Sequence, residues 1–431
     1  MPGNSPSKPR KLATVQAVSL GLLLLTGTLN YMDRSALSVT NSAILHDLHL
    51  DLGEMGLLLS AFSWSYALAQ LPVGGLIDRY RPRKVLAFGI VVWSIAQGLC
   101  GFVRNWATFL AARILLGIGE SPQYPTGARV VSDWYPLGKR GFPTGVFNSA
   151  AALGTAVAQP VLALILVATD WRWVFVVLGI AGVFVGLLWW LTYRNPEEVV
   201  LSEADRETIA HSAVKPSSGG FAEWLALFRH GTTWGMILGF FGSVYLLWLY
   251  VTWLPGYLHM ARHMTTLQTG FAAFVPFFCG FVGCWVAGGL SDWMVRLTGS
   301  AVKGRRLLAV IAMLGMAAFV VPGALVQSNV VAVACISVVM FLSNVASTSS
   351  WALVSAVAPQ RQVASLGAVQ NFGGYIGGAL APAVTGFVVQ ATGSFVPAML
   401  LGAVIVSLSA LAYLFGVTKP IEDPVIVDDV F

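Results

Sequence analysis

Charge is the scarcest property of this chain. Only 10% of its 431 residues are Asp, Glu, Lys or Arg, whereas 56% are hydrophobic. A soluble domain carries about 25% charged residues, so this composition excludes an ordinary soluble globule. Long apolar runs are present instead, at Ala17–Leu29, Trp173–Leu191 and Met399–Val417. Runs of this length are typical of membrane-spanning helices, and the chain is predicted to be a polytopic membrane protein.

Other scarcities exclude further classes. The four cysteines, Cys100, Cys279, Cys284 and Cys335, all fall within apolar runs, so no disulfide framework is predicted. The six histidines lie in loops or at span ends and predict no metal site. No phosphate-binding Gly-Lys-Ser/Thr loop is present, which argues against ATP as an energy source, and no cofactor is predicted. The apolar run after Met1–Lys11 is too long for a signal peptide, so the first helix is expected to remain as an anchor.

Hydropathy predicts an all-α membrane protein with twelve transmembrane helices. The expected spans lie near residues 15–40, 54–77, 84–103, 106–131, 140–168, 171–193, 232–258, 267–291, 305–327, 329–357, 361–391 and 394–416. One long polar segment, 194–231, divides six spans from six. The predicted domains are therefore an N-terminal bundle at 1–193, a central loop at 194–231 and a C-terminal bundle at 232–431.

The basic residues follow the membrane. Nineteen of the 25 Lys and Arg residues fall in loops on one side of the predicted spans, and three, Arg104, Arg172 and Arg262, fall on the other side. Such asymmetry places both termini and the central loop in the cytoplasm. The formal charge of +6 is therefore interpreted as topology, and no nucleic-acid partner is predicted.

The two halves repeat one another. Pro136, Asn148, Ala168-Thr169 and Gly179 recur 223 residues later as Pro359, Asn371, Ala391-Thr392 and Gly402. Several matches at one offset around a central polar loop indicate duplication. Two parallel six-helix repeats predict a binding site between the halves at mid-membrane depth.

Two acids, Asp33 and Glu120, lie inside otherwise apolar spans. A charge at the centre of a spanning helix costs about 2.5–3.5 kcal/mol on insertion scales, so such residues usually serve an ion path, a polar cavity or a proton relay. The alternative is a structural ion pair that only holds helices together. Partners for such pairs are available: Arg34 follows Asp33 directly, and Arg113 precedes Glu120 by seven residues.

A motif between the second and third predicted spans resembles the signature of the major facilitator superfamily. It reads Gly74-x-x-x-Asp78-Arg79-x-Arg81-x-Arg83-Lys84. The resemblance implies a cytoplasmic gate formed by Gly74, Asp78, Arg79 and Arg83, in which the carboxylate pairs with loop arginines and helix termini. The family pattern has glycine where this chain has Arg81, so the tight turn there is an open question.

More specific motifs resemble the anion:cation symporter family, and within it the D-galactonate transporter group. They are Asn30-Tyr31-x-Asp33-Arg34-x-x-Leu37-Ser38-Val39, Gly117-x-Gly119-Glu120-Ser121-Pro122-x-Tyr124-Pro125, Trp134-Tyr135-Pro136, Trp253-Leu254-Pro255-x-Tyr257-Leu258, Trp351-x-Leu353-Val354-Ser355 and Asn371-Phe372-Gly373-Gly374. The resemblance implies that Asp33 and Glu120 are the proton-coupling residues. It implies a substrate site of Tyr31, Arg34, Arg113, Tyr66, Trp351 and Asn371.

The resemblance implies a monomeric inner-membrane symporter that uses protons to import a small organic anion, a sugar acid or a related carboxylate, by alternating access. The chain departs from the galactonate type at Ala151 and Phe240, where that group has glutamines. Losing two amides leaves substrate hydroxyls without partners, which predicts a less hydroxylated or aromatic acid. The alternatives are efflux or exchange of a hydrophobic or aromatic acid on the same fold, which Phe240, Phe241 and Trp248 favour, and a non-transporting membrane sensor.

Overall fold

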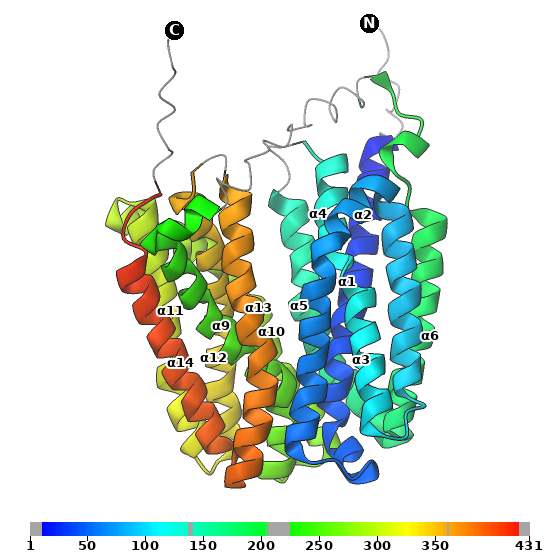
Figure 1. Cartoon of the computed structure of the whole chain (residues 1–431), viewed down its shortest axis with the longest axis vertical. Coiled ribbons are helices and arrows are strands. Elements are labelled where there is room, and N and C mark those ends of the chain that lie inside the picture. Colours follow the sequence, from blue (N-terminus) through cyan, green and yellow to red (C-terminus); the bar gives the residue numbers. More distant parts are fainter. Residues whose placement is uncertain (1–10, 137–140, 204, 206–224, 360–361, 422–431) are drawn as a thin grey trace, which may run out of the picture. The chain divides into compact units, whose positions relative to one another are not determined.

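The computed structural model describes residues 11–136, 141–203, 205, 225–359 and 362–421 (Figure 1). The chain forms two compact units. One comprises residues 1–48 and 61–215, and the other comprises residues 49–60 and 216–431. Along the chain the main change of unit falls within 194–231, the segment predicted as the central loop, and residues 49–60 group with the second unit. The predicted domain bounds at 193 and 231 stay predictions.

The first half of the chain is helical throughout its described spans. Its helices are α1 (Lys11–Asp47), α2 (Leu52–Cys100), α3 (Trp106–Glu120), α4 (Gln123–Trp134), α5 (Gly141–Ala168) and α6 (Trp171–Thr192), followed by the 3₁₀ turn η2 (Pro196–Glu198). The polar loop between α2 and α3 ends at Asn105, whose side chain accepts a hydrogen bond from the Thr108 amide and caps α3. Asp170 caps α6 in the same way.

The second half repeats this order. After the 3₁₀ turn η3 (Leu227–Arg229) come α9 (Gly231–Gly256), the π-helical turn η4 (Tyr257–Ala261), α10 (Thr266–Thr298), α11 (Ala301–Leu325), α12 (Asn329–Val357), α13 (Val363–Thr392) and α14 (Phe395–Gly416). No strand occurs in the described part of the chain. The all-α fold class is confirmed.

Ten helical segments within the described residues are long and apolar enough to span a membrane. The two predicted spans outside that set are 54–77 and 106–131. The first forms the N-terminal part of α2, and the second is divided into α3 and α4. The total of twelve spans stays a prediction.

The offset of 223 residues predicted from the sequence also relates the helices. Adding 223 to the residue numbers of Trp106–Trp134 gives 329–357, which are the bounds of α12. Adding 223 to those of α6 gives 394–415, one residue from the bounds of α14. The repeat differs at one place, because α12 is continuous whereas its counterpart is broken between α3 and α4. Pro122 causes the break, since proline offers no N–H to the preceding turn, and Val345 stands at its counterpart.

Candidate functional site

The first unit holds a buried cluster of two acids and two arginines. Asp33 and Arg34 come from the middle of α1, and Arg113 and Glu120 come from α3. Their exposed fractions lie between 0% and 6%. Four charged groups in an apolar bundle must neutralise one another or bind something charged, so this cluster is the candidate functional site.

The pairing in the cluster differs from the one that sequence proximity suggests. Nε of Arg34 donates to Oε2 of Glu120 at 2.8 Å, and does so across 86 residues of sequence. Arg34 reaches Glu120 at the end of α3, whereas the carboxylate of its neighbour Asp33 makes no hydrogen bond among the described residues. Glu120 therefore pairs with Arg34 of α1, whereas the sequence suggested Arg113 of its own helix as the partner.

Three aromatic rings surround the Arg34 guanidinium. Its Cζ lies 4.7 Å from the ring centre of Tyr31, 4.8 Å from Phe62 and 4.6 Å from Tyr66. Cation–π contacts of this kind strengthen in desolvated sites. The three rings therefore hold the guanidinium in place beside Glu120.

Phe62 is a site residue that the sequence analysis missed. Its ring contacts Arg34 and also lies 5.2 Å from Cζ of Arg113, and it stacks on Tyr66 at 5.7 Å. The available signal was its spacing, since Phe62 precedes the predicted site residue Tyr66 by four residues and therefore shares its helix face. Phe62 thus links the two arginines through one ring.

Asp33 and Arg113 are buried near one another without a direct ion pair. Asp33 lies within interaction range of the charges of Glu120, Arg113 and Arg34, yet neither of its carboxylate oxygens has a hydrogen-bond partner among the described residues. The same holds for Nε and Nη1 of Arg113. Buried charged atoms without partners are costly. Asp33 and Arg113 therefore both carry buried polar atoms without hydrogen-bond partners among the described residues.

Two glycines bring α3 close enough to α2 to place Glu120. A Cβ on Gly117 would lie 2.1 Å from the Ser65 hydroxyl oxygen and 2.6 Å from the Phe62 carbonyl oxygen, and one on Gly119 would lie 2.6 Å from the Trp93 backbone nitrogen. Only glycine permits this backbone approach. The helix then ends at Glu120, where Ser121 makes a hydrogen bond to Ile118 before Pro122.

The predicted tyrosines both lie in the first unit, but their side chains make different contacts. Tyr66 is fully buried, and its hydroxyl accepts a hydrogen bond from Nε2 of Gln70 at 2.9 Å. Tyr31 is half-buried and meets the ring of Tyr124 edge-on at 6.3 Å. Both rings reach Arg34, so each shapes the arginine site directly.

The other two predicted substrate residues belong to the second unit. Trp351 of α12 is 45% exposed and meets the Phe240 ring edge-on at 6.0 Å. Asn371 of α13 is half-buried. Phe240 itself is only 3% exposed, and a Cβ on Gly374 would lie 2.6 Å from its ring. The Phe240 ring therefore packs inside its own unit, between α12 and α13. Ala151 is half-buried on α5.

The predicted gate motif lies near the middle of α2. Gly74 and Arg79 are exposed, the guanidinium of Arg79 lies 5.3 Å from the ring centre of Tyr80, and the side chain of Asp78 lies outside the described residues. At Arg81 the helix is interrupted by a left-handed backbone, with φ 71° and ψ 154°. The turn that the family makes with glycine thus forms here with arginine, which pairs with Glu197.

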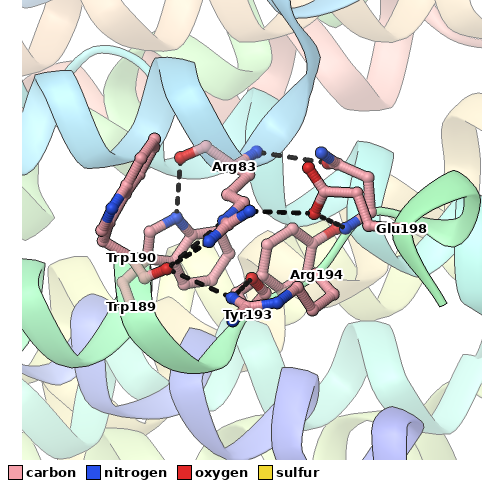
Figure 2. A network of polar contacts seen from close by, with 7 residues as sticks. Arg83, Trp189, Trp190, Tyr193, Arg194 and Glu198 are labelled. Atoms are coloured by element: carbon pink, nitrogen blue, oxygen red, sulfur yellow. Dashed lines mark hydrogen bonds and ion pairs between the residues drawn. The ribbon is translucent and has the colours of Figure 1, made fainter.

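Arg83 fastens the start of the second part of α2 to the end of α6 (Figure 2). Its Nη2 donates to the Trp190 carbonyl at 2.8 Å, and Nη1 lies 3.2 Å from the Glu198 carboxylate. Burial alone would raise the pKa of Glu198, but the hydrogen bond from the Asn195 amide and the Arg83 charge outweigh it, so that pKa lies below its ordinary value. In the second unit Arg306, 223 residues later, donates to the Val417 carbonyl after α14.

The described residues contain no group of three or more His, Cys, Asp and Glu side chains placed to hold a metal ion. In the cluster, carboxylates can take up and release protons, and guanidinium groups can bind anions.

Comparison with known proteins agrees with this arrangement. The family model of the Major Facilitator Superfamily matches residues 23–382. The "Probable L-galactonate transporter" of Escherichia coli (strain K12) is 39% identical over 427 residues, which cover 98% of this chain and 94% of the relative. The "D-galactonate transporter" of Escherichia coli O6:H1 is 30% identical over 411 residues, covering 92% and 94%.

A solved structure shows the same fold. It is a bacterial homologue of the human lysosomal transporter Spinster in an inward-facing and occupied conformation, with a TM-score of 0.75 at 19% identity, covering 95% of this chain and 97% of the other. Together with the family match and the 39% identical relative, the buried charges and apolar helices lead to one conclusion. The chain belongs to the Major Facilitator Superfamily, and it is a membrane transporter rather than an enzyme.

Proposed function

We propose that this protein is a proton-coupled symporter that imports a sugar acid by alternating access. The observation that carries the proposal is the Arg34–Glu120 pair, fully buried and enclosed by three aromatic rings. Because Arg34 is held in place and paired with Glu120, it can bind a substrate carboxylate only when that ion pair breaks. Protonation is what makes the acid give way.

The coupling follows from this competition. While Glu120 is ionised, it occupies the Nε donor of Arg34 at 2.8 Å. A proton on Glu120 removes its charge and leaves the guanidinium to a substrate carboxylate, to which arginine can donate two parallel hydrogen bonds. Proton and substrate then bind together, since each favours the state that accepts the other.

Asp33 supplies the second titrating group. Asp33 is 1% exposed, and its carboxylate has no hydrogen-bond partner among the described residues. Arg113 lies nearby, and its Nε and Nη1 atoms have no hydrogen-bond partner there either. Charge balance in the cluster is two acids against two arginines. Protonating both acids leaves two uncompensated guanidinium groups, and the substrate anion restores part of the balance.

The membrane orientation follows from the basic residues. Nineteen Lys and Arg residues lie in loops on one side of the predicted spans. Under the positive-inside rule this asymmetry supports the proposal that both termini lie in the cytoplasm, on the inner side of an inner membrane. The proposed transport unit is a single chain, because both acids and both arginines come from α1 and α3 of one chain.

The substrate class is proposed from the relatives and from Phe240. Relatives at 39% and 30% identity carry the names of galactonate transporters. The expectation of a less hydroxylated acid rested on Ala151 and Phe240 as cavity walls, but the Phe240 ring is covered by Trp351 and α13. We therefore favour an aldonate, a hydroxylated six-carbon acid. Trp351, half-exposed, and Asn371 are proposed to contact it.

Uptake into proteoliposomes tests the coupling. Asp33→Asn and Glu120→Gln should lose accumulation driven by a pH gradient, while at least one of them still binds substrate or exchanges it across the membrane. Asp47→Asn is the control, because the Oδ2 atom of Asp47 pairs with Arg172 at the end of α1, outside the cluster. Full concentrative uptake by both cluster variants would disprove the assignment of the coupling residues.

Competition assays test the substrate. L-galactonate and D-galactonate should inhibit uptake of a labelled aldonate more strongly than benzoate or propionate does. Stronger inhibition by the aromatic or short aliphatic acids would instead support the alternative of a hydrophobic acid carrier. Binding without any flux in the same liposomes would point to a membrane sensor.

A further inference from the structure

A column of polar side chains follows one face of α1. Spacings of three, four and seven residues place them on the same side of the helix, and they are Gln16, Ser19, Thr26, Asn30 and Asp33. All except Gln16 are at most 2% exposed. From Gln16 to Asn30 the helix rises about 21 Å at 1.5 Å per residue. The one apolar member of this face is Leu23, which is also fully buried.

A second polar column faces it from α4. Gln123, Thr126 and Asp133 lie on one side of this helix, with buried Val130 between them. Gln123 and Thr126 are fully buried. Only two residues separate Gln123 from the end of α3 at Glu120. The column on α4 therefore continues directly from the coupling acid.

Hydrogen bonds fix how the two columns face each other. Nε2 of Gln123 donates to Oγ1 of Thr26 at 2.9 Å. At the other end, Nε2 of Gln16 donates to the Trp134 carbonyl at 2.6 Å, and the Tyr135 hydroxyl donates to the Gln16 carbonyl at 3.0 Å. The helices are thus antiparallel along this seam.

The register between these fixed ends places a polar group at each turn. Thr126 stands about level with Leu23, and Ser19 stands about level with Val130. Each apolar position on one helix is therefore matched by a hydroxyl on the other. We call the two columns together the α1–α4 seam. Every helical turn of the seam, from Glu120 to the surface of the bundle at Gln16 and Asp133, contains at least one polar side chain.

Several atoms in the seam have no hydrogen-bond partner among the described residues. They are Oε1 of Glu120, both side-chain polar atoms of Asn30, Oε1 of Gln123 and Oγ1 of Thr126. Buried polar atoms in proteins are almost always paired, and ordered water takes this role where protein atoms do not. For helix packing alone, apolar residues would be more favourable here. The hydroxyl and amide groups of the seam thus keep hydrogen-bonding capacity that water molecules can take up.

We propose that the α1–α4 seam carries the proton between Glu120 and the protein face at Gln16 and Asp133. This inference rests on the proposed proton coupling. The proton leaves the Glu120 carboxyl group, passes between water molecules that Asn30, Gln123 and Thr126 hold, and enters bulk water, so no bond other than O–H bonds forms or breaks.

The charged groups along this route support the direction. Arg34 contacts Glu120 at the inner end, with Asp33 and Arg113 nearby. At the outer end Asp133 pairs with Arg129. A deprotonated Glu120 regains Arg34 as its partner, so release of the proton restores the buried ion pair.

Thr126→Val tests the seam with a nearly isosteric change that removes the hydroxyl, and Thr126→Ser keeps the hydroxyl. The matched control is Thr40→Val, because Thr40 is fully buried on α1 on the other side of Asp33 and its hydroxyl bonds to the Ala36 carbonyl of its own helix. Gln123→Met is a second, independent seam variant. Thermal unfolding checks that each variant is folded.

The measurements use L-galactonate as the probe in proteoliposomes that contain a pH-sensitive dye. We expect Thr126→Val to lower galactonate-dependent proton influx and uphill uptake at least tenfold, while galactonate counterflow at equal pH stays within twofold of the wild type. Thr126→Ser should restore proton influx, and Thr40→Val should behave as the wild type.

Two results would overturn the proposal. In one, Thr126→Val and Gln123→Met keep wild-type proton influx. In the other, counterflow falls as much as proton influx, which would assign these residues to packing. Failure of the proposed function itself is distinct, because the wild type would then take up galactonate without any proton signal.

Discussion

Replacing Arg34 by lysine probes the arginine site most directly. Lysine keeps the positive charge but not the planar group, and its ammonium cannot lie against three rings at once. In the wild type the guanidinium carbon sits 4.6–4.8 Å from the ring centres of Tyr31, Phe62 and Tyr66 while Nε donates to Glu120. A substrate carboxylate would need the same geometry.

The magnitude can be worked from these contacts. A hydrogen bond to a charged group contributes about 1.5–3 kcal/mol, and a cation–π contact contributes about 0.5–1 kcal/mol at exposed sites and more when desolvated. The loss of the second hydrogen bond of a bidentate contact, or of two desolvated ring contacts, costs more than about 1.4 kcal/mol of binding free energy. A difference of that size is tenfold in affinity or rate. Arg34→Lys should therefore reduce transport at least tenfold.

Arg129→Lys is the matched control. Its guanidinium pairs with Asp133 at 2.8 Å, but its side chain is 32% exposed and the partner is four residues along the same helix. Such pairs contribute about 0.3–0.5 kcal/mol, so the variant should retain about half of wild-type transport or more. Initial uptake rates, normalised to the folded protein in the membrane, compare the two. Equal losses in both variants would refute the placement of Arg34 at the anion site.

Three further predictions concern stability and pH. Gly119→Ala should lower the unfolding temperature by several degrees, because the added Cβ would lie 2.6 Å from the Trp93 backbone nitrogen and overpacking costs about 1–3 kcal/mol. Gly98→Ala is the control, because a Cβ at Gly98 would have nothing within 4 Å. An unchanged unfolding temperature for Gly119→Ala would contradict the close approach of the two helices. Arg81→Gly should raise the unfolding temperature. A non-glycine residue at φ 71° costs about 1–3 kcal/mol of backbone strain, whereas the exposed ion pair of Arg81 contributes only about 0–1 kcal/mol. A lower unfolding temperature would mean that the ion pair outweighs the strain. The pKa of Glu198 is below its ordinary 4.5, so the ionised form of Glu198 stabilises the fold above that pH. This stabilisation disappears as the pH falls through the lowered pKa. Glu198→Gln should therefore be slightly less stable than the wild type at pH 7 and equally stable in strong acid. A stability difference that persisted at low pH would exclude this electrostatic origin.

Much of the architecture was predictable from the sequence because it depends on local pattern. Apolar runs of about 20 residues identify spanning helices, and that signal requires no knowledge of partners. The duplication was visible as matches at an offset of 223, and the helix bounds follow the same offset. Asp33 and Glu120 were identifiable as special residues because a carboxylate in an apolar run is costly wherever it points.

The tertiary structure decided which groups meet. The Arg34–Glu120 pair joins residues 86 positions apart, and the ring of Phe62 reaches both arginines; neither contact leaves a periodic signal in the sequence. Close packing of α3 on α2 through Gly117 and Gly119 sets these contacts. Pairing partners in a bundle depend on helix rotation and depth, which arise from packing between helices, whereas the sequence pattern of each helix reports only which residues share a face.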